Sequence, residues 1–187
     1  MYKRFEKAFI THCAATLAGH KAGSLFSYRL AQGEDPDAYV NHINEKLGHK
    51  NLEVRLLRHC NKCCLVYVYR PSMLRRRLDA AAEREFLCRY GYAECQDIDE
   101  HISLLSKRIY CGNNFPHEIG VFLDYPLDDV LGFIRNKGCN YCCSGCWKAY
   151  SDPETARRRF ALYEKCRQIY LKCYKDGMDV MRLTVAA

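Results

Sequence analysis

The chain has 187 residues with 49% hydrophobic and 27% charged side chains, and its formal net charge is +7 at pH 7. This composition is typical of a globular protein, and the length allows one domain spanning residues 1–187 to bury its own core. No stretch approaches the ~20 consecutive apolar residues of a membrane span, so we expect no membrane partner.

The first part of the chain shows both helical and strand patterns. Asp35 followed by Pro36 is an N-cap with proline at the first helical position, and Gly19 and Gly48 are helix stops. Leu52–Arg58 alternates apolar and charged residues, as a half-buried strand does. The predicted elements are a helix over 2–18, a strand over 24–30, a helix over 36–47, a hairpin of strands 52–58 and 64–70 turning at 59–63, and helices near 72–90 and 96–110.

The segment from Phe115 to Tyr150 predicts a strand, a helix and a second strand. Ile119–Tyr125 is a continuous apolar run, which is typical of a buried strand. Pro126–Lys137 has a helical pattern that ends at Gly138, and Trp147–Tyr150 predicts a short closing strand.

A final helix is predicted from the capping box at Ser151-Asp152-Pro153-Glu154 to Gly177. The elements together predict an α+β fold with a small mixed β-sheet, made of the hairpin plus a β-α-β unit. Several helices, including the long C-terminal one, pack against this sheet.

Two long motifs resemble those of a known family. They are HCAATLAGHKAGSLF, from His12 to Phe26, and FPHEIGVFLDYPLDDVLGFI, from Phe115 to Ile134, which continues into the G-x-W-K-x-Y ending of Gly145 to Tyr150. The family is an uncharacterised one from clostridial-type anaerobic bacteria, known as domain of unknown function 3793. The resemblance covers nearly the whole chain and implies a bacterial intracellular protein, but it supplies no catalytic residues. Most of the cysteines lie outside the family pattern.

Thirteen cysteines are far more than a chain of this size usually carries. Disulfide frameworks belong mainly to small secreted domains, and the count here is odd. The N-terminal run MYKRFEKAFITHCAATLAG contains His12 and continues into an amphipathic pattern, so we do not interpret it as a signal peptide. We therefore expect a cytoplasmic protein with reduced thiols.

The cysteines form two clusters that could hold a metal. A C-x-x-C turn directs two thiolates to one point, and two such turns brought together would make a tetrahedral zinc site. The separation of the clusters is much larger than the roughly 15–20 residues of familiar zinc ribbons. An iron–sulfur cluster and scattered free thiols are the alternatives. The candidate ligands are Cys60, Cys63, Cys139, Cys142, Cys143 and Cys146.

Four residues are candidates for catalysis. His117 beside Glu118 could act as an acid/base pair or as a metal ligand, although Glu118 could equally pair with an arginine. Lys21, in the loop after the first helix, is free to meet an anion. Cys13 lies on the predicted buried stripe of that helix, where a thiol is usually inert.

Three further residues are candidates for binding a cofactor or ligand. Asp124 stands at the carboxyl end of a predicted buried strand, where α/β sheets commonly bind ligands. Trp147 and Lys148 could offer stacking and charge to a planar anion, although a single tryptophan is more often part of the core.

Three functional hypotheses remain open. The first is an accessory or binding protein that uses cysteine thiolates, with a redox or metal-handling protein as its partner. The second is a small enzyme built around His117, Glu118 and Lys21, with Cys13 as a further candidate. The third is nucleic-acid binding through Arg75–Arg77 and Arg157–Arg159, which no aromatic-basic platform supports. No phosphate-binding glycine loop, serine elbow or zinc-protease helix is present.

Overall fold

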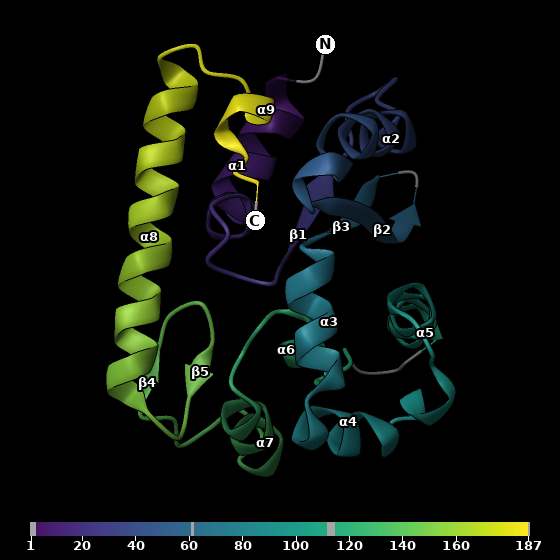
Figure 1. The fold of residues 1–187 in the computed structure, drawn as a ribbon, viewed down its shortest axis with the longest axis vertical. Coiled ribbons are helices and arrows are strands. Elements are labelled where there is room, and N and C mark those ends of the chain that lie inside the picture. Colours follow the sequence, from purple (N-terminus) through teal and green to yellow (C-terminus); the bar gives the residue numbers. More distant parts are fainter. Residues whose placement is uncertain (1–2, 61, 112–114, 187) are drawn as a thin grey trace.

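The computed structural model describes residues 3–60, 62–111 and 115–186 (Figure 1). Among these residues no helix combines the length and the apolarity that crossing a bilayer requires. The helices are α1 Lys3–Leu17, α2 Pro36–Leu47, α3 Pro71–Asp79, α4 Ala81–Cys88, α5 Ile98–Cys111, α6 Ile119–Phe122, α7 Leu127–Arg135, α8 Pro153–Lys175 and α9 Val180–Leu183, with 3-10 turns at Gly48–Lys50 and Tyr92–Glu94. The strands are β1 Gly23–Arg29, β2 Glu53–Cys60, β3 Cys63–Tyr69, β4 Cys143–Ser144 and β5 Lys148–Ala149.

The main sheet has three antiparallel strands in the order β1-β3-β2. The predicted hairpin is confirmed, and its strands extend further than expected because Cys60 pairs with Cys63 at the turn. The register of β2 shifts between Leu56 and Arg58, where the strand carries a bulge.

Helices cover both faces of this sheet. Alternate strand residues such as Val66 and Val68 point into a core shared with α1, α2 and α9. The intervening residues, such as Tyr67 and Tyr69, pack against side chains of α3, α5 and α6. Figure 1 shows α2 on one side of the sheet and α3 and α5 on the other.

The prediction of a strand over Ile119–Tyr125 is wrong. Residues Ile119–Phe122 form the short helix α6, and the chain then turns at Asp124, which has a φ of 62°. Its aliphatic residues and Phe122 are buried as predicted, and Tyr125 is partly buried, but a short apolar run fits a buried helix as well as a buried strand. The carbonyl of Phe122 accepts a 2.7 Å hydrogen bond from the Tyr67 hydroxyl instead of joining a sheet.

The predicted β-α-β unit is therefore not formed, and the main sheet is antiparallel rather than mixed. Of the strand predicted over Trp147–Tyr150, only β5 is extended, and it pairs with β4 in a separate two-stranded sheet. The α+β class and the long C-terminal helix are confirmed.

The long helix α8 lies beside α1 and carries the β4–β5 hairpin at its N-terminal end (Figure 1). Asp152 caps α8, accepting a 3.0 Å hydrogen bond from the backbone N–H of Thr155 as the capping pattern predicts. A third core cluster joins α1, the hairpin and α8, and it contains Ala15, Trp147, Ala149, Ala156 and Tyr163.

Candidate ligand-binding site

Lys21 is positioned by the end of α1. Gly19 has a φ of 75°, the N–H of His20 donates to the carbonyl of Ala15 at 2.9 Å, and the N–H of Gly19 donates to that of Thr16 at 3.1 Å. These two bonds make a Schellman motif, which reverses the chain. Lys21 follows directly, before β1 begins, and its side chain enters the space between α1 and α8.

The Lys21 side chain is buried, with 8% of its surface exposed, although the sequence suggested a free loop residue. Its Nζ lies 5.4 Å from the ring centre of Tyr125 and 5.8 Å from that of Tyr163. Within the described residues, Nζ has these two cation–π contacts but neither a hydrogen bond nor an ion pair. Burial lowers the pKa of this amine, because removal from water disfavours the ammonium form.

The amine faces a cavity of about 330 Å³ between α1, α8 and the β4–β5 hairpin. The cavity wall includes Thr11, His12, Lys21, Ser24, Cys146 and Tyr163, together with Glu164 and Arg167, which pair with each other at 2.6 Å. His12 stacks on Phe26 with ring centres 5.2 Å apart, and partial burial lowers the pKa of its imidazole. Hydroxyl, imidazole, thiol and amine groups thus converge on one small space.

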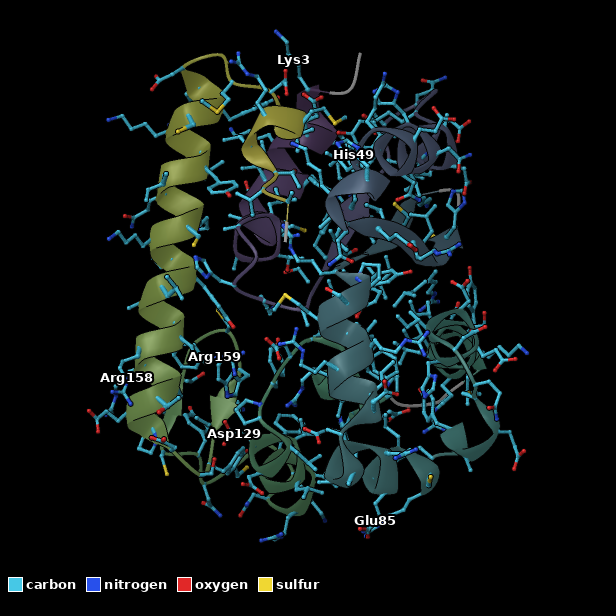
Figure 2. All side chains as sticks on the ribbon, viewed as in Figure 1. Lys3, His49, Glu85, Asp129, Arg158 and Arg159 are labelled. Atoms are coloured by element: carbon cyan, nitrogen blue, oxygen red, sulfur yellow. The ribbon has the colours of Figure 1, made fainter. Side chains whose placement is uncertain are left out.

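Asp124 does not serve as a free ligand at this site, because two arginines already bind it. Its carboxylate lies 2.9 Å from Arg159 and 3.6 Å from Arg77. It also accepts a 3.4 Å hydrogen bond from the backbone N–H of Ala22, next to Lys21. Figure 2 shows Arg159 pointing from α8 toward the interior, whereas the neighbouring Arg158 points away from the molecule.

This ion network leaves the charge of Lys21 uncompensated. Arg159 and Asp124 form a pair, and Arg77 also lies 2.8 Å from Glu83. Tyr163 adds no negative charge, since burial raises the pKa of its hydroxyl, which accepts hydrogen bonds from Arg159 at 3.1 and 2.8 Å. The carboxylates of Asp124 and Glu83 are thus matched by the guanidinium groups of Arg159 and Arg77. The protonated amine of Lys21 remains as the excess positive charge.

A second cavity, of about 400 Å³, lies on the other side of the hairpin and is lined mainly by apolar groups. It brings together His117, Trp147 and Lys148, three of the residues singled out in the sequence. Trp147 is part of the core and donates from Nε1 to Asp129 at 2.7 Å. The Nζ of Lys148 donates to the carbonyl of Gly138 at 2.8 Å. These two polar groups are therefore already satisfied within the protein.

The residues proposed for catalysis do not gather at one site. Glu118 is buried and pairs with Arg108, while His117 is exposed and meets the ring of Phe133 edge-on at 5.2 Å. Cys13 is fully buried, and burial raises the pKa of its thiol well above the usual value, which makes it a poor nucleophile. Lys21 and His117 each line a cavity, and of these two only the Lys21 side chain is buried.

The two cysteine clusters also lie apart. Figure 1 shows the β2–β3 turn and the β4–β5 hairpin at opposite sides of the molecule. No group of three or more His, Cys, Asp or Glu residues close enough to hold a metal occurs in the described ranges. Cys142 and Cys143 instead contact backbone carbonyls, at 3.6 and 3.7 Å, and Cys146 contributes to the Lys21 cavity. Cys60 and Cys63 approach each other, with their sulfurs 3.2 Å apart.

The aromatic and ionic surroundings of Lys21 were not predicted from the sequence. Tyr125 follows Asp124 in the second family motif, and Tyr163 lies in the predicted last helix. Nothing in the sequence indicated that these two rings and Arg159 would meet a lysine from the first motif. That meeting depends on the packing of α1 against α8.

Comparison with known proteins identifies one family. A family model described as "Protein of unknown function (DUF3793)" matches residues 9–184. Neither curated proteins nor solved structures gave a match.

Proposed function

The chain belongs to the family described as protein of unknown function (DUF3793), and we propose that it binds a small organic anion in the Lys21 cavity. One observation carries this proposal: a lysine amine opens onto a cavity while the described chain offers it no carboxylate or carbonyl partner. Buried cations are costly unless they are paired, so a cationic side chain in such a place favours an anionic ligand.

The walls of the cavity favour a carboxylate on an apolar body. The ammonium of Lys21 would receive the anionic group. In the same wall, the Thr11 hydroxyl already donates to the carbonyl of Lys7 at 2.6 Å, and the Ser24 hydroxyl is hydrogen-bonded to that of Thr16 at 2.9 Å. The rings of Phe160 and Tyr163 supply apolar surface for the rest of the molecule. Pockets that combine apolar walls with a few converging polar groups are typical of small-molecule sites.

Binding would change the protonation of Lys21. An anion next to the amine stabilises the ammonium form and opposes the effect of burial on its pKa. The ligand should therefore be taken up together with a proton at pH values between the lowered pKa and the ordinary one. This proton uptake distinguishes a ligand held by Lys21 from one bound elsewhere on the surface.

The test uses the single tryptophan of the chain as a reporter. Trp147 stacks on Tyr125, whose ring also contacts Lys21, so a ligand in the cavity should change its emission. The probes are acetate, benzoate, their neutral amides and inorganic phosphate. We expect a carboxylate, and not its amide, to quench or shift the emission and to raise the melting temperature. Calorimetry in buffers of different ionisation heat should show proton uptake.

Two variants complete the experiment. Lys21→Met keeps the apolar stem and removes the charge, and it should weaken binding at least tenfold. Lys165→Met, on the exposed side of α8, removes an equal charge and should bind as the wild type does. Binding that persists unchanged in Lys21→Met, or a preference for the neutral amide, would show that the proposal is wrong.

The other hypotheses have less support. Arg77 and Arg159, one from each basic run proposed to bind nucleic acid, are engaged in the ion network around Asp124. A reducing cytoplasmic location remains a prediction, based on the cysteine content. The thiolate hypothesis is best supported at Cys60 and Cys63, a site separate from the Lys21 cavity.

A further inference from the structure

We propose that Cys60 and Cys63 form a thiol–disulfide exchange site whose substrate is a small disulfide that carries carboxylates. The two residues flank the turn between β2 and β3, and both side chains are exposed. Their sulfur atoms lie 3.2 Å apart, so either thiol can reach the other without a change in the fold.

The backbone accommodates both redox forms. Cys60 and Cys63 are directly opposite partners in the antiparallel ladder. Such partners have Cα atoms roughly 4.5–5.5 Å apart, which lies within the range of roughly 4.4–6.8 Å that disulfides tolerate. Oxidation needs only a shortening of the sulfur separation from 3.2 Å to roughly 2.05 Å.

The two cysteines have unequal roles. Hydrogen bonds from the backbone N–H of Lys62 and from the Cys63 thiol stabilise the Cys60 thiolate and lower its pKa. The same sulfur contact raises the pKa of Cys63. We assign the attack to Cys60, because the backbone N–H of Lys62 donates to its sulfur, and the resolving step to Cys63. This hairpin turn supplies the stabilisation that a helix N-terminus provides in other dithiol sites.

The exchange balances in two steps. The Cys60 thiolate attacks one sulfur of the substrate disulfide, the substrate S–S bond breaks, and one substrate thiolate leaves and takes up a proton. Cys63 then loses its proton and attacks the Cys60 sulfur, which breaks the mixed disulfide and releases the second thiolate. The protein loses two electrons and two protons, and the substrate gains them as two thiols.

Positive charge around the turn selects for an anionic substrate. Arg29 is the ladder partner of Cys63 on β1, and Arg58 lies two residues before Cys60. Both arginines are exposed and favour the thiolate forms of the pair. Asp37 on α2 lies 3.6 Å from His59, and among the described residues no ion pair joins it to either arginine.

Differential alkylation followed by peptide mass spectrometry tests the proposal on the full chain. The reduced protein is mixed with oxidised glutathione and quenched at intervals. Trypsin cuts after Lys62, so Cys60 and Cys63 fall in separate peptides that only a disulfide holds together. We expect this linked pair to appear before any other cysteine is modified.

Single variants separate the two steps. Cys63→Ser should accumulate glutathione on Cys60, whereas Cys60→Ser should slow the modification of Cys63 at least tenfold. Cys88→Ser, which removes an exposed cysteine on α4, is the matched control and should leave the linked pair unchanged. The proposal is overturned if Cys88 and the Cys139–Cys146 cluster react as fast as Cys60, or if the purified protein holds stoichiometric zinc through Cys60.

A cationic probe tests the preference for an anion. Cystamine is a disulfide with two amines, and it should react at least threefold more slowly than oxidised glutathione. Changing Arg29 and Arg58 to Gln together should remove this difference. A faster reaction with cystamine in the wild type would refute the carboxylate specificity.

Discussion

Lys21 illustrates how the surroundings of one residue determine its chemistry. A lysine after a helix-ending glycine is normally an exposed cation, and the sequence suggested as much. In the fold it lies against Tyr125 and Tyr163, and burial lowers the pKa of its amine. The aromatic rings compensate only part of the lost hydration, since a cation–π contact contributes roughly 0.5–2 kcal/mol. The part of the lost hydration free energy that the rings do not compensate destabilises the folded protein, and an anionic ligand can offset it.

We therefore expect Lys21→Met to be more stable than the wild type, by roughly 1–3 kcal/mol near neutral pH. The unfolded chain holds the lysine proton up to a pKa of about 10.4, and the folded protein releases it at lower pH. The cost to the wild type is thus complete below the folded pKa and disappears as the pH rises toward about 10.4.

Urea unfolding at about pH 6 and about pH 9.5 measures this difference. The stability gain of Lys21→Met should be larger at the lower pH. Lys165→Met should show no such trend, because that side chain is exposed. A Lys21→Met protein that is destabilised at both pH values would assign the lysine a structural role.

At the level of elements, local signals predicted helix ends well. Asp35 and Asp152 cap α2 and α8, and Gly19 ends α1, as their positions in the sequence indicated. These features depend on hydrogen bonds within a few residues, so the local sequence contains what is needed to predict them.

The Ile119–Tyr125 segment failed because its structure depends on distant partners. Its apolar residues were correctly predicted to be buried, but burial alone does not distinguish a strand from a short helix. The site was predicted only in part for the same reason. Lys21 was named, whereas its burial by residues about a hundred positions away in the chain had no local signal.

The β4–β5 hairpin that separates the two cavities is held by one carboxylate. Asp129 on α7 is buried and accepts from Trp147 Nε1 and Tyr150 N, each at 2.7 Å. It also accepts from the N–H and the hydroxyl of Ser151, at 3.0 and 2.9 Å. Figure 2 shows Asp129 between α7 and this hairpin.

Asp129→Asn should destabilise the protein by roughly 2 kcal/mol, because the amide NH2 that replaces one carboxylate oxygen would face a donor and cannot accept its hydrogen bond. We expect a lower melting temperature and a shift in the emission of Trp147, whose Nε1 loses its partner. Asp128→Asn removes the same charge from the exposed face of α7 and should change neither. Equal effects of the two substitutions would mean that the negative charge of Asp129, and not its hydrogen bonds, stabilises the hairpin.

At the scale of the whole molecule, Arg70 joins segments that are distant in the sequence. It follows β3, is fully buried, and donates to the carbonyls of Thr16 and Leu17 at 2.6 and 2.7 Å. It also donates to Lys50 at 3.1 Å and to Val185 at 2.9 Å. One guanidinium thus joins the end of α1, the turn after α2 and the segment after α9, and it also lies near the negative end of the α1 dipole.

Since these carbonyls have little access to water, removing their common donor leaves several of them unsatisfied. We expect Arg70→Met to lose roughly 3 kcal/mol of stability, which corresponds to a fall of about 10 °C in melting temperature for a chain of this size. Arg84→Met, on the exposed face of α4, is the matched control.

Hydrogen exchange in Arg70→Met should be faster in α1, in the turn at Gly48–Lys50 and in α9 together. Acceleration confined to one of these segments would show that Arg70 does not link them. The end of α1 also positions Lys21, so Arg70→Met should weaken anion binding as well, whereas Lys21→Met weakens binding without loss of stability.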